Sequence, residues 1–418
     1  MKISRRKFIA GSAISLAGLS FLPRAFANTF LFPYNENNLK KARRIHQRIL
    51  TVDTHCDTPL SIMYDKIEMG VRNDVKVTGS KVDFVRMKEG GLDASFFAVF
   101  LGQGKRDPES NLKAKSDALA IFEAIKQQLK KYPGQAELAL EPDDAYRISK
   151  TGKRAIYIGI ENGYPIGNEI KNIQEFYNLG ARYITLCHSR NNDICDSSTD
   201  EKGPEHNGLS PFGEKVVAEM NRLGMLVDVS HISDKSFFDV VKLSKAPIIA
   251  SHSSARTVCN HPRNFSDEML KTMAEKGGVV QLCVLNSYIK EQKPNPAREE
   301  AFKALRLKYN NFVDITPEQK GEAIKEWQKI SDDFPEELAT VSDAVDHIDH
   351  MVKTAGIDHV GIGTDFDGGG GISGFFDISE ATNITIELVK RGYLAKDIEK
   401  IWGGNFMRVF RQVRQMAG

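Results

Sequence analysis

The sequence lacks the features that mark several classes of protein. Beyond its first residues no stretch reaches about 18 uninterrupted apolar residues, so no membrane-spanning helix is predicted. A formal net charge of only +2 gives no electrostatic reason to expect nucleic acid as a partner. The five cysteines show no C-x-x-C spacing, which disfavours a disulfide framework or a structural zinc site, although one pair could form in an exported protein.

The N-terminus resembles an export signal rather than part of the fold. A basic segment at 1–7 precedes a modestly apolar segment at 8–22 and the sequence Ala-Phe-Ala at 25–27, which is a typical cleavage site. Ser-Arg-Arg-Lys-Phe at 4–8 resembles the twin-arginine signal, and an ordinary secretory signal is the alternative. We therefore predict a signal peptide at 1–27 and a mature periplasmic protein, residues 28–418, without a membrane anchor.

Along the rest of the chain, short apolar runs alternate with amphipathic segments. We predict strands at 48–56, 93–101, 154–161, 182–188, 225–230, 247–252, 278–284 and 359–365, with helices including 109–131, 210–223, 233–244, 265–276 and 340–355. This repeated alternation predicts an α/β fold whose parallel sheet closes into a (β/α)₈ TIM barrel. The alternative is an open doubly wound sheet, but no G-x-G-x-x-G follows the first strand.

One segment breaks this alternation. Residues 287–340, between the seventh and eighth strands, are charged and carry little strand signal, while 301–309 and 323–327 have helical patterns. We expect a helical insertion on the C-terminal face of the barrel, where it would cover the site, contact a partner subunit or remain a solvated decoration. Residues 367–376 form a glycine-rich loop on the same face.

Reactive side chains recur where the predicted strands end. The first strand ends in a histidine and an aspartate two residues apart, and five later strands each end in one histidine or carboxylate. The full set is His55, Asp57, Glu161, His188, His231, His252 and Asp365. Each alone could be a hydrogen-bonded core histidine or a helix cap. Because the C-terminal ends of barrel strands meet at one mouth, we expect all seven in one site.

Such a mixture predicts a metal centre. Imidazoles and carboxylates gathered without a cation would repel one another or remain unpaired. Two divalent ions about 3.5–4 Å apart can share a bridging carboxylate, for which the central Glu161 is the natural candidate. Water bridging such ions has a pKa near about 7, so hydroxide can attack a carbonyl polarised by one ion. Asp365 could then carry the proton to the leaving amine.

The motifs, taken in order, resemble the membrane dipeptidase (renal dipeptidase) family. They are His55-x-Asp57, Glu161-Asn162-Gly163, Leu186-Cys187-His188-Ser189, Asp228-Val229-Ser230-His231, Ser251-His252-Ser253-Ser254, Pro262-Arg263-Asn264 and Gly363-Thr364-Asp365-Phe366-Asp367-Gly368. The resemblance runs from about residue 45 to 412. It implies a (β/α)₈ dipeptidase with two zinc ions, in which His55 and Asp57 bind one zinc, His231 and His252 bind the other, and Glu161 bridges both.

The resemblance also implies roles for three further side chains. His188 would stabilise the oxyanion beside the reacting carbonyl, Arg263 would clamp the free C-terminal carboxylate of the substrate, and Asp365 would be the general acid and base. Family members accept dipeptides, often with a D-residue at the C-terminal position, and are usually homodimers. The mammalian members carry a lipid anchor, which we do not expect for this protein, and its 287–340 segment is longer than theirs.

Two other functions fit the same residues. One is a related barrel hydrolase acting on another amide, a lactam or an ester; only a substrate with a carboxylate would need Arg263. The other is a catalytically inactive binding protein on the same barrel, against which the complete set of metal ligands and Asp365 argue.

Overall fold

The computed structural model describes residues 36–64, 67–310 and 315–418, so the predicted signal peptide lies outside the described residues. The chain divides into two units, Met1–Lys41 and Ala42–Gly418. Apart from residues 36–41, everything below concerns the second unit, which contains all the predicted site residues. Within the described ranges no helix has the length and apolar character needed to cross a membrane.

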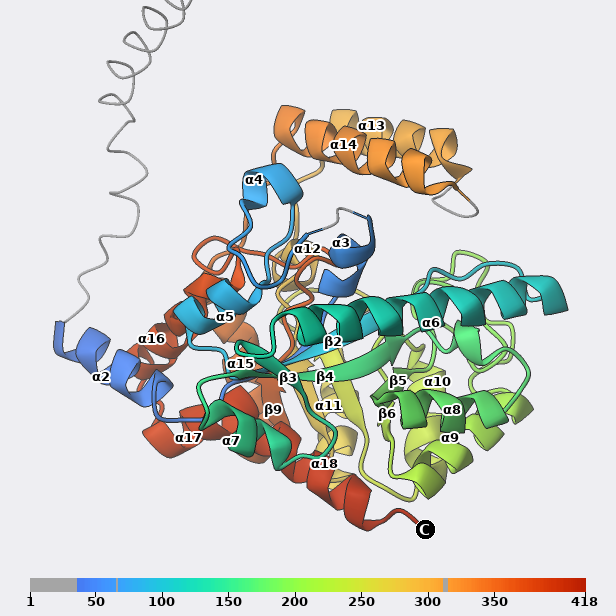
Figure 1. Cartoon of the computed structure of the whole chain (residues 1–418). Coiled ribbons are helices and arrows are strands. Elements are labelled where there is room, and N and C mark those ends of the chain that lie inside the picture. The colour runs from blue at the N-terminus through green and yellow to red at the C-terminus, as the bar shows by residue number, and fades with distance from the viewer. Residues whose placement is uncertain (1–35, 65–66, 311–314) are drawn as a thin grey trace, which may run out of the picture. The chain divides into compact units, whose positions relative to one another are not determined.

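Eight parallel strands follow one another around a barrel in chain order (Figure 1). They are β1 (Val52–Cys56), β2 (Ala94–Phe100), β4 (Arg154–Glu161), β5 (Ala181–Thr185), β6 (Leu226–Asp228), β7 (Ile249–Ser253), β8 (Val279–Leu282) and β9 (Val360–Ile362). A parallel bridge between Cys56 and Phe366 joins the last strand to the first, with Asp57 N–H donating to the Phe366 carbonyl over 2.8 Å. The predicted TIM barrel is therefore confirmed. One strand was not predicted: β3 (Ala136–Leu138) pairs with the first residues of β4.

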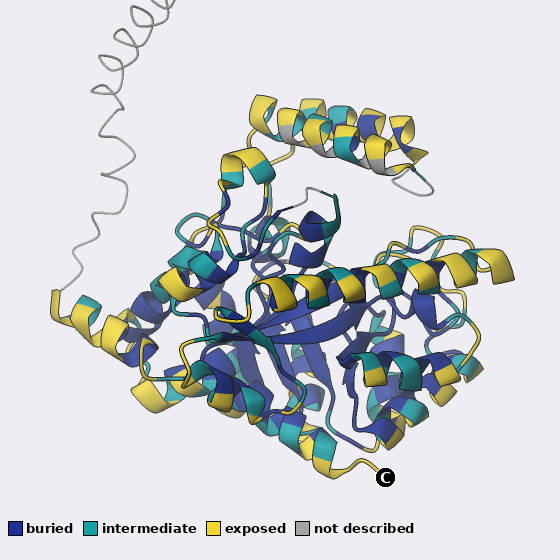
Figure 2. Cartoon of the chain, viewed as in Figure 1, coloured by how far each residue is buried: buried dark blue, intermediate teal, exposed yellow. Residues whose placement is uncertain are grey.

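Helices connect the strands, and most of them pack around the barrel with their outer faces exposed and the strands buried (Figure 2). The helices are α2 (Glu36–His46), α3 (Thr58–Tyr64), α4 (Val75–Thr78), α5 (Phe84–Gly90), α6 (Pro108–Lys131), α7 (Asp144–Ser149), α8 (Lys171–Leu179), α9 (Pro211–Leu223), α10 (Asp234–Leu243), α11 (Asp267–Glu275), α12 (Asn286–Ile289), α13 (Pro296–Lys308), α14 (Pro317–Asp333), α15 (Val341–Ala355), α16 (Thr382–Lys390), α17 (Ala395–Glu399) and α18 (Asn405–Gln415). Ser233 and Ser266 cap α10 and α11 by accepting hydrogen bonds from backbone N–H groups, as their sequence positions predict.

The end of the barrel opposite the site is filled by aromatic side chains. Phe96 stacks on the rings of Tyr157 and Tyr183, with centroids 4.6 and 5.4 Å away, and Phe406 of α18 meets it edge-on at 5.0 Å. The Tyr183 ring packs directly against Gly159, where a Cβ would stand 2.0 Å from the ring, so only glycine fits at this position. This apolar packing closes the N-terminal mouth and supports the polar layer above it.

The predicted insertion is a pair of helices, α13 and α14, joined through residues outside the described ranges. The pair has its own small core, in which Phe302, Leu305, Tyr309 and Ala323 are buried. In Figure 1 the two helices stand beyond α3 and α4, and α14 contacts α3. The insertion therefore lies on the face where the strands end, as expected.

Candidate metal centre

The structure brings all seven predicted strand-end residues to the C-terminal mouth, although several strands end earlier than predicted. His55, Glu161 and His252 lie within β1, β4 and β7. The other four follow their strands, and two of them, His231 and Asp365, have left-handed backbones with φ of 70° and 58°. Such conformations cost roughly 1–3 kcal/mol and are found where a site requires a particular side-chain direction.

Glu161 stands at the centre of the group. Its Oε2 lies 3.4 Å from His55 Nε2, while its Oε1 lies 3.0 Å from His231 Nε2 and 3.4 Å from His252 Nε2. The Nε2 atoms of His231 and His252 are 2.8 Å apart. The two carboxylate oxygens therefore face two different sets of imidazoles.

Two further carboxylates stand beside His55. Asp57 Oδ2 is 3.6 Å from His55 Nε2, and ligand atoms of His55, Asp57 and Asp365 all lie within 4.8 Å of one another. Among the described residues, His55 Nε2 and Asp57 Oδ1 are buried without a hydrogen-bond partner. Unpaired buried donors and acceptors are costly, so these atoms fit a ligand or ion that would pair with them.

His188 is the most accessible of the histidines, with 26% of its side chain exposed. Its Nε2 lies 3.7 Å from Glu161 Oε1, its Nδ1 is 2.9 Å from the Ser189 hydroxyl, and its ring meets Phe100 edge-on at 4.7 Å. It therefore lines the accessible side of the group, where a substrate would contact it.

Sequence reasoning missed the residues that orient the histidines. The Tyr183 hydroxyl lies 2.8 Å from His55 Nδ1. Ser251 donates its hydroxyl proton to Asp228 over 2.6 Å, so its oxygen can accept from His252 Nδ1, 2.8 Å away. With the proton on Nδ1 in each contact, Nε2 faces the centre and its lone pair is available to a cation. Asp228 and Ser251 stand in the quoted motifs, but no role was assigned to them, and Tyr183 carries no sequence signal.

For most of the group the electrostatics disfavour ionised side chains. His55 is the exception: burial opposes its charged form, but Tyr183, Glu161 and Asp57 raise its pKa well above the usual value. Burial, and then the charge of Arg263, lowers the pKa of His188 to about 3 and that of His231 well below its usual value. Burial, and then Asp57, raises the pKa of Asp365 well above its usual value. A divalent cation would favour neutral imidazoles and ionised carboxylates, which is the protonation state needed for binding.

Arg263 lies on the loop after β7, is 2% exposed and faces the group. Its Nη2 donates to the His252 carbonyl over 3.0 Å, and its Cζ lies 5.5 Å from the centroid of the Tyr288 ring. Its Nε is buried without a hydrogen-bond partner in the described part of the chain. A buried guanidinium with an unused donor suits a planar anion such as a carboxylate. Tyr288 was not predicted from the sequence.

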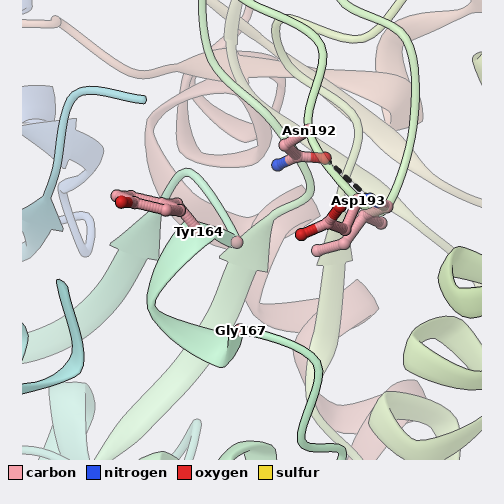
Figure 3. A pocket seen from close by; sticks show the side chains of 6 residues that line it. Tyr164, Gly167, Asn192 and Asp193 are labelled. Carbon is pink, nitrogen blue, oxygen red and sulfur yellow. Dashed lines mark hydrogen bonds between the residues drawn. The ribbon is translucent and has the colours of Figure 1, made fainter. Parts of the chain in front are cut away.

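A small pocket beside the centre is less suited to chemistry. Figure 3 shows Tyr164, Asn192 and Asp193 around it, with the Asn192 side chain accepting a hydrogen bond from Ile194 N–H over 2.9 Å. Asp193 is paired with Arg106 at 3.4 Å. The polar groups of this pocket are thus engaged in holding the loop after β5.

Comparisons with known proteins point to one family. The sequence model described as "Membrane dipeptidase (Peptidase family M19)" matches residues 39–418. Dipeptidase tcpJ of Claviceps purpurea is 33% identical over 341 residues, which cover 80% of this chain and 70% of that protein. The crystal structure of the "probable dipeptidase PvdM" from Pseudomonas aeruginosa has a TM-score of 0.79 at 30% identity, covering 92% of this chain and all of the other.

A more distant structure shows the same fold with a ligand. The metallo peptidase from Rhodobacter sphaeroides, described as liganded with a phosphinate mimic of the dipeptide L-Ala-D-Ala, has a TM-score of 0.69 at 22% identity. The alignment covers 87% of this chain and 99% of that one.

Proposed function

The chain belongs to the membrane dipeptidase family, peptidase family M19, and is a hydrolase acting on peptide bonds; from this premise we propose that it is a zinc dipeptidase with a binuclear centre. We propose dipeptides of the L-Xaa-L-Xaa and L-Xaa-D-Xaa types as its substrates. The arrangement of Glu161 carries the proposal, because its two oxygens face His55 on one side and the pair His231 and His252 on the other.

The residues present fit two divalent ions. His55, Asp57 and Glu161 Oε2 would hold one, and His231, His252 and Glu161 Oε1 would hold the other. Imidazole nitrogen and carboxylate oxygen are ligands that zinc accepts, and the unpartnered His55 Nε2 and Asp57 Oδ1 support an ion at the first position. Such ions, when bound, would supply hydroxide at neutral pH and polarise the scissile carbonyl.

The remaining side chains would bind the substrate and move protons. Arg263 would pair with the C-terminal carboxylate of a dipeptide, which would limit the enzyme to substrates whose scissile bond lies one residue from that carboxylate. His188, kept neutral by burial, would donate a hydrogen bond to the oxygen that gains charge. Asp365, whose pKa burial raises, would hold the proton and pass it to the leaving amine.

A dipeptide panel on metal-analysed protein tests the proposal. We expect hydrolysis of L,L- and L,D-dipeptides, loss of activity with a chelator, and recovery with two equivalents of zinc. Peptides blocked by C-terminal amidation should be poor substrates. Hydrolysis of a lactone or lactam but of no dipeptide would favour a related barrel hydrolase, and absence of all turnover in the fully metallated protein would favour an inactive binding protein.

Export and assembly are further parts of the proposal. The Arg-Arg pair at positions 5–6 supports export to the periplasm by the twin-arginine route, which would deliver a folded, metallated enzyme. Replacing both arginines by lysine should keep the protein in the cytoplasm, as cell fractionation would measure. We also propose a homodimer, by analogy with the family, which light scattering would test.

A further inference from the structure

The glycine-rich loop after β9, residues 365–376, lies directly against the carboxylates of Asp57 and Asp365. Asp365 opens this loop, and its backbone carbonyl accepts hydrogen bonds from the N–H groups of Gly368 and Gly370 over 3.2 and 2.7 Å. A Cβ on Gly368 would stand 2.1 Å from Asp57 Oδ2 and 2.3 Å from Asp365 Oδ1. Of the two residues only Asp365 belongs to this loop, whereas Asp57 belongs to the segment after β1. A displacement of the loop would therefore move Asp365 first.

One lysine from a distant part of the sequence makes several contacts with this loop. Lys81, just before α5, donates from its ammonium to the Gly370 carbonyl, and the same Nζ lies 4.5 Å from the centroid of the Phe376 ring. Its backbone N–H donates to Asp367 Oδ1 over 2.6 Å, and its carbonyl accepts from Ile378 N–H over 3.1 Å. Lys81 thus contacts the loop near its start, its middle and its end.

The cradle around the ammonium is closely fitted. A Cβ on Gly371 would stand 2.6 Å from Lys81 Nζ, so this glycine leaves the space that the cation fills. Burial lowers the pKa of Lys81, and the charges of Asp367 and Asp365 oppose that effect. Desolvating a cation is costly, and here the ammonium is stabilised by the Gly370 carbonyl and the Phe376 ring, which both belong to the loop.

We propose that Lys81 is a positioning residue for Asp365: its ammonium holds the glycine loop in the one arrangement that aims the Asp365 carboxylate at the reacting centre. This inference rests on the proposed proton-transfer role of Asp365. Lys81 acts through the loop and does not touch the substrate. The charge should therefore affect turnover and leave dipeptide binding and metal content nearly unchanged.

Lys81→Met tests the inference, with Lys276→Met as its matched control. Lys276 also donates from its ammonium to a backbone carbonyl, that of Ser244, and burial also lowers its pKa, but it lies near the opposite end of the barrel. We expect Lys81→Met to lower kcat at least tenfold with KM within twofold and metal content unchanged. Hydrogen exchange of the amides at 366–376 should become faster, and neither change should occur in Lys276→Met. Lys81→Ala carries the same expectation if methionine does not fit.

A double mutant separates this inference from the proposed function. If Lys81 acts through Asp365, Lys81→Met should lower the residual turnover of Asp365→Asn by less than twofold, because coupled residues are not additive. A full tenfold loss in that background, or unchanged kcat and exchange in Lys81→Met, would overturn the inference. Near-normal turnover of Asp365→Asn alone would instead refute the proton-transfer role.

Discussion

Removing the Tyr183 hydroxyl should weaken metal binding, although this hydroxyl contacts a proposed ligand, His55, and not the metal itself. With His55 Nε2 directed at Asp57 and Glu161, the metal-binding tautomer carries its proton on Nδ1, 2.8 Å from the Tyr183 oxygen. Tyr183→Phe keeps the ring in the aromatic layer and leaves this buried N–H without an acceptor. Such a loss costs about 1–3 kcal/mol, and outer-shell changes of this kind weaken metal affinity about 10–100-fold.

Tyr157→Phe is the matched control. Tyr157 is also fully buried in the barrel, and its hydroxyl accepts from Ala145 N–H over 3.1 Å and donates to the Glu141 carbonyl over 2.9 Å, away from the centre. Competition with a chromophoric chelator would give the affinity for zinc, and thermal unfolding would give the stability.

Both variants should be less stable than the unmutated protein. Only Tyr183→Phe should bind zinc more weakly, and only at the site that includes His55. Equal zinc affinity in Tyr183→Phe and the unmutated protein would refute the argument that this hydroxyl fixes the tautomer of His55. An equal loss of affinity in Tyr157→Phe would show that the effect comes from general loosening of the barrel.

Three other substitutions test separate parts of the reasoning. Glu161→Gln should lose at least one metal equivalent, because one neutral amide cannot bridge two cations; full occupancy by elemental analysis would contradict the bridge. Arg263→Ala should lower kcat/KM for dipeptides by about 30–5,000-fold, mostly through KM, since a buried charge pair is worth about 2–5 kcal/mol; unchanged kinetics would place Arg263 outside the binding site. Burial lowers the pKa of His46 from 6.5 to about 4. Below pH 6.5 the unfolded state therefore binds a proton at this position that the folded state does not, and His46 alone should lower the stability by about 1.4 kcal/mol per pH unit down to about pH 4. His46→Gln should lack this dependence, and a pKa near 6.5 for His46 by NMR titration would contradict it.

The neutral form of His46 is specified by its contacts. Its Nε2 lies 2.8 Å from the Gly90 carbonyl, so this nitrogen must donate, and its Nδ1 lies 2.7 Å from the Thr385 hydroxyl. Trp402 Nε1 donates to that same hydroxyl oxygen over 2.7 Å, which directs the threonine proton to His46 Nδ1. A second proton on the ring would break this arrangement in a buried position.

Much of the fold could be predicted from the sequence because the relevant signals are local. Apolar runs of strand length, Ser233 and Ser266 before helices, and the charged 287–340 segment each depend on neighbouring residues alone. The strand β3 could not be predicted in this way, because its three residues are stabilised by pairing with the start of β4. The predicted ends of β5, β6 and β9 lie too far along the chain. The residues after these strands have a strand-like sequence, but they lie beyond the paired part of each strand and turn their side chains toward the site.

The same distinction between local and long-range signals applies to the candidate site. The residues able to bind metal could be recognised from local patterns, since His55, Glu161 and His252 end apolar runs whose ends must meet in a barrel. Which oxygen of Glu161 faces which imidazole, and the contacts of Tyr183, Tyr288 and Lys81 with the group, depend on how distant segments pack. Those contacts join residues separated by about a hundred positions or more in several cases, and a side chain's direction depends on packing that no local pattern records.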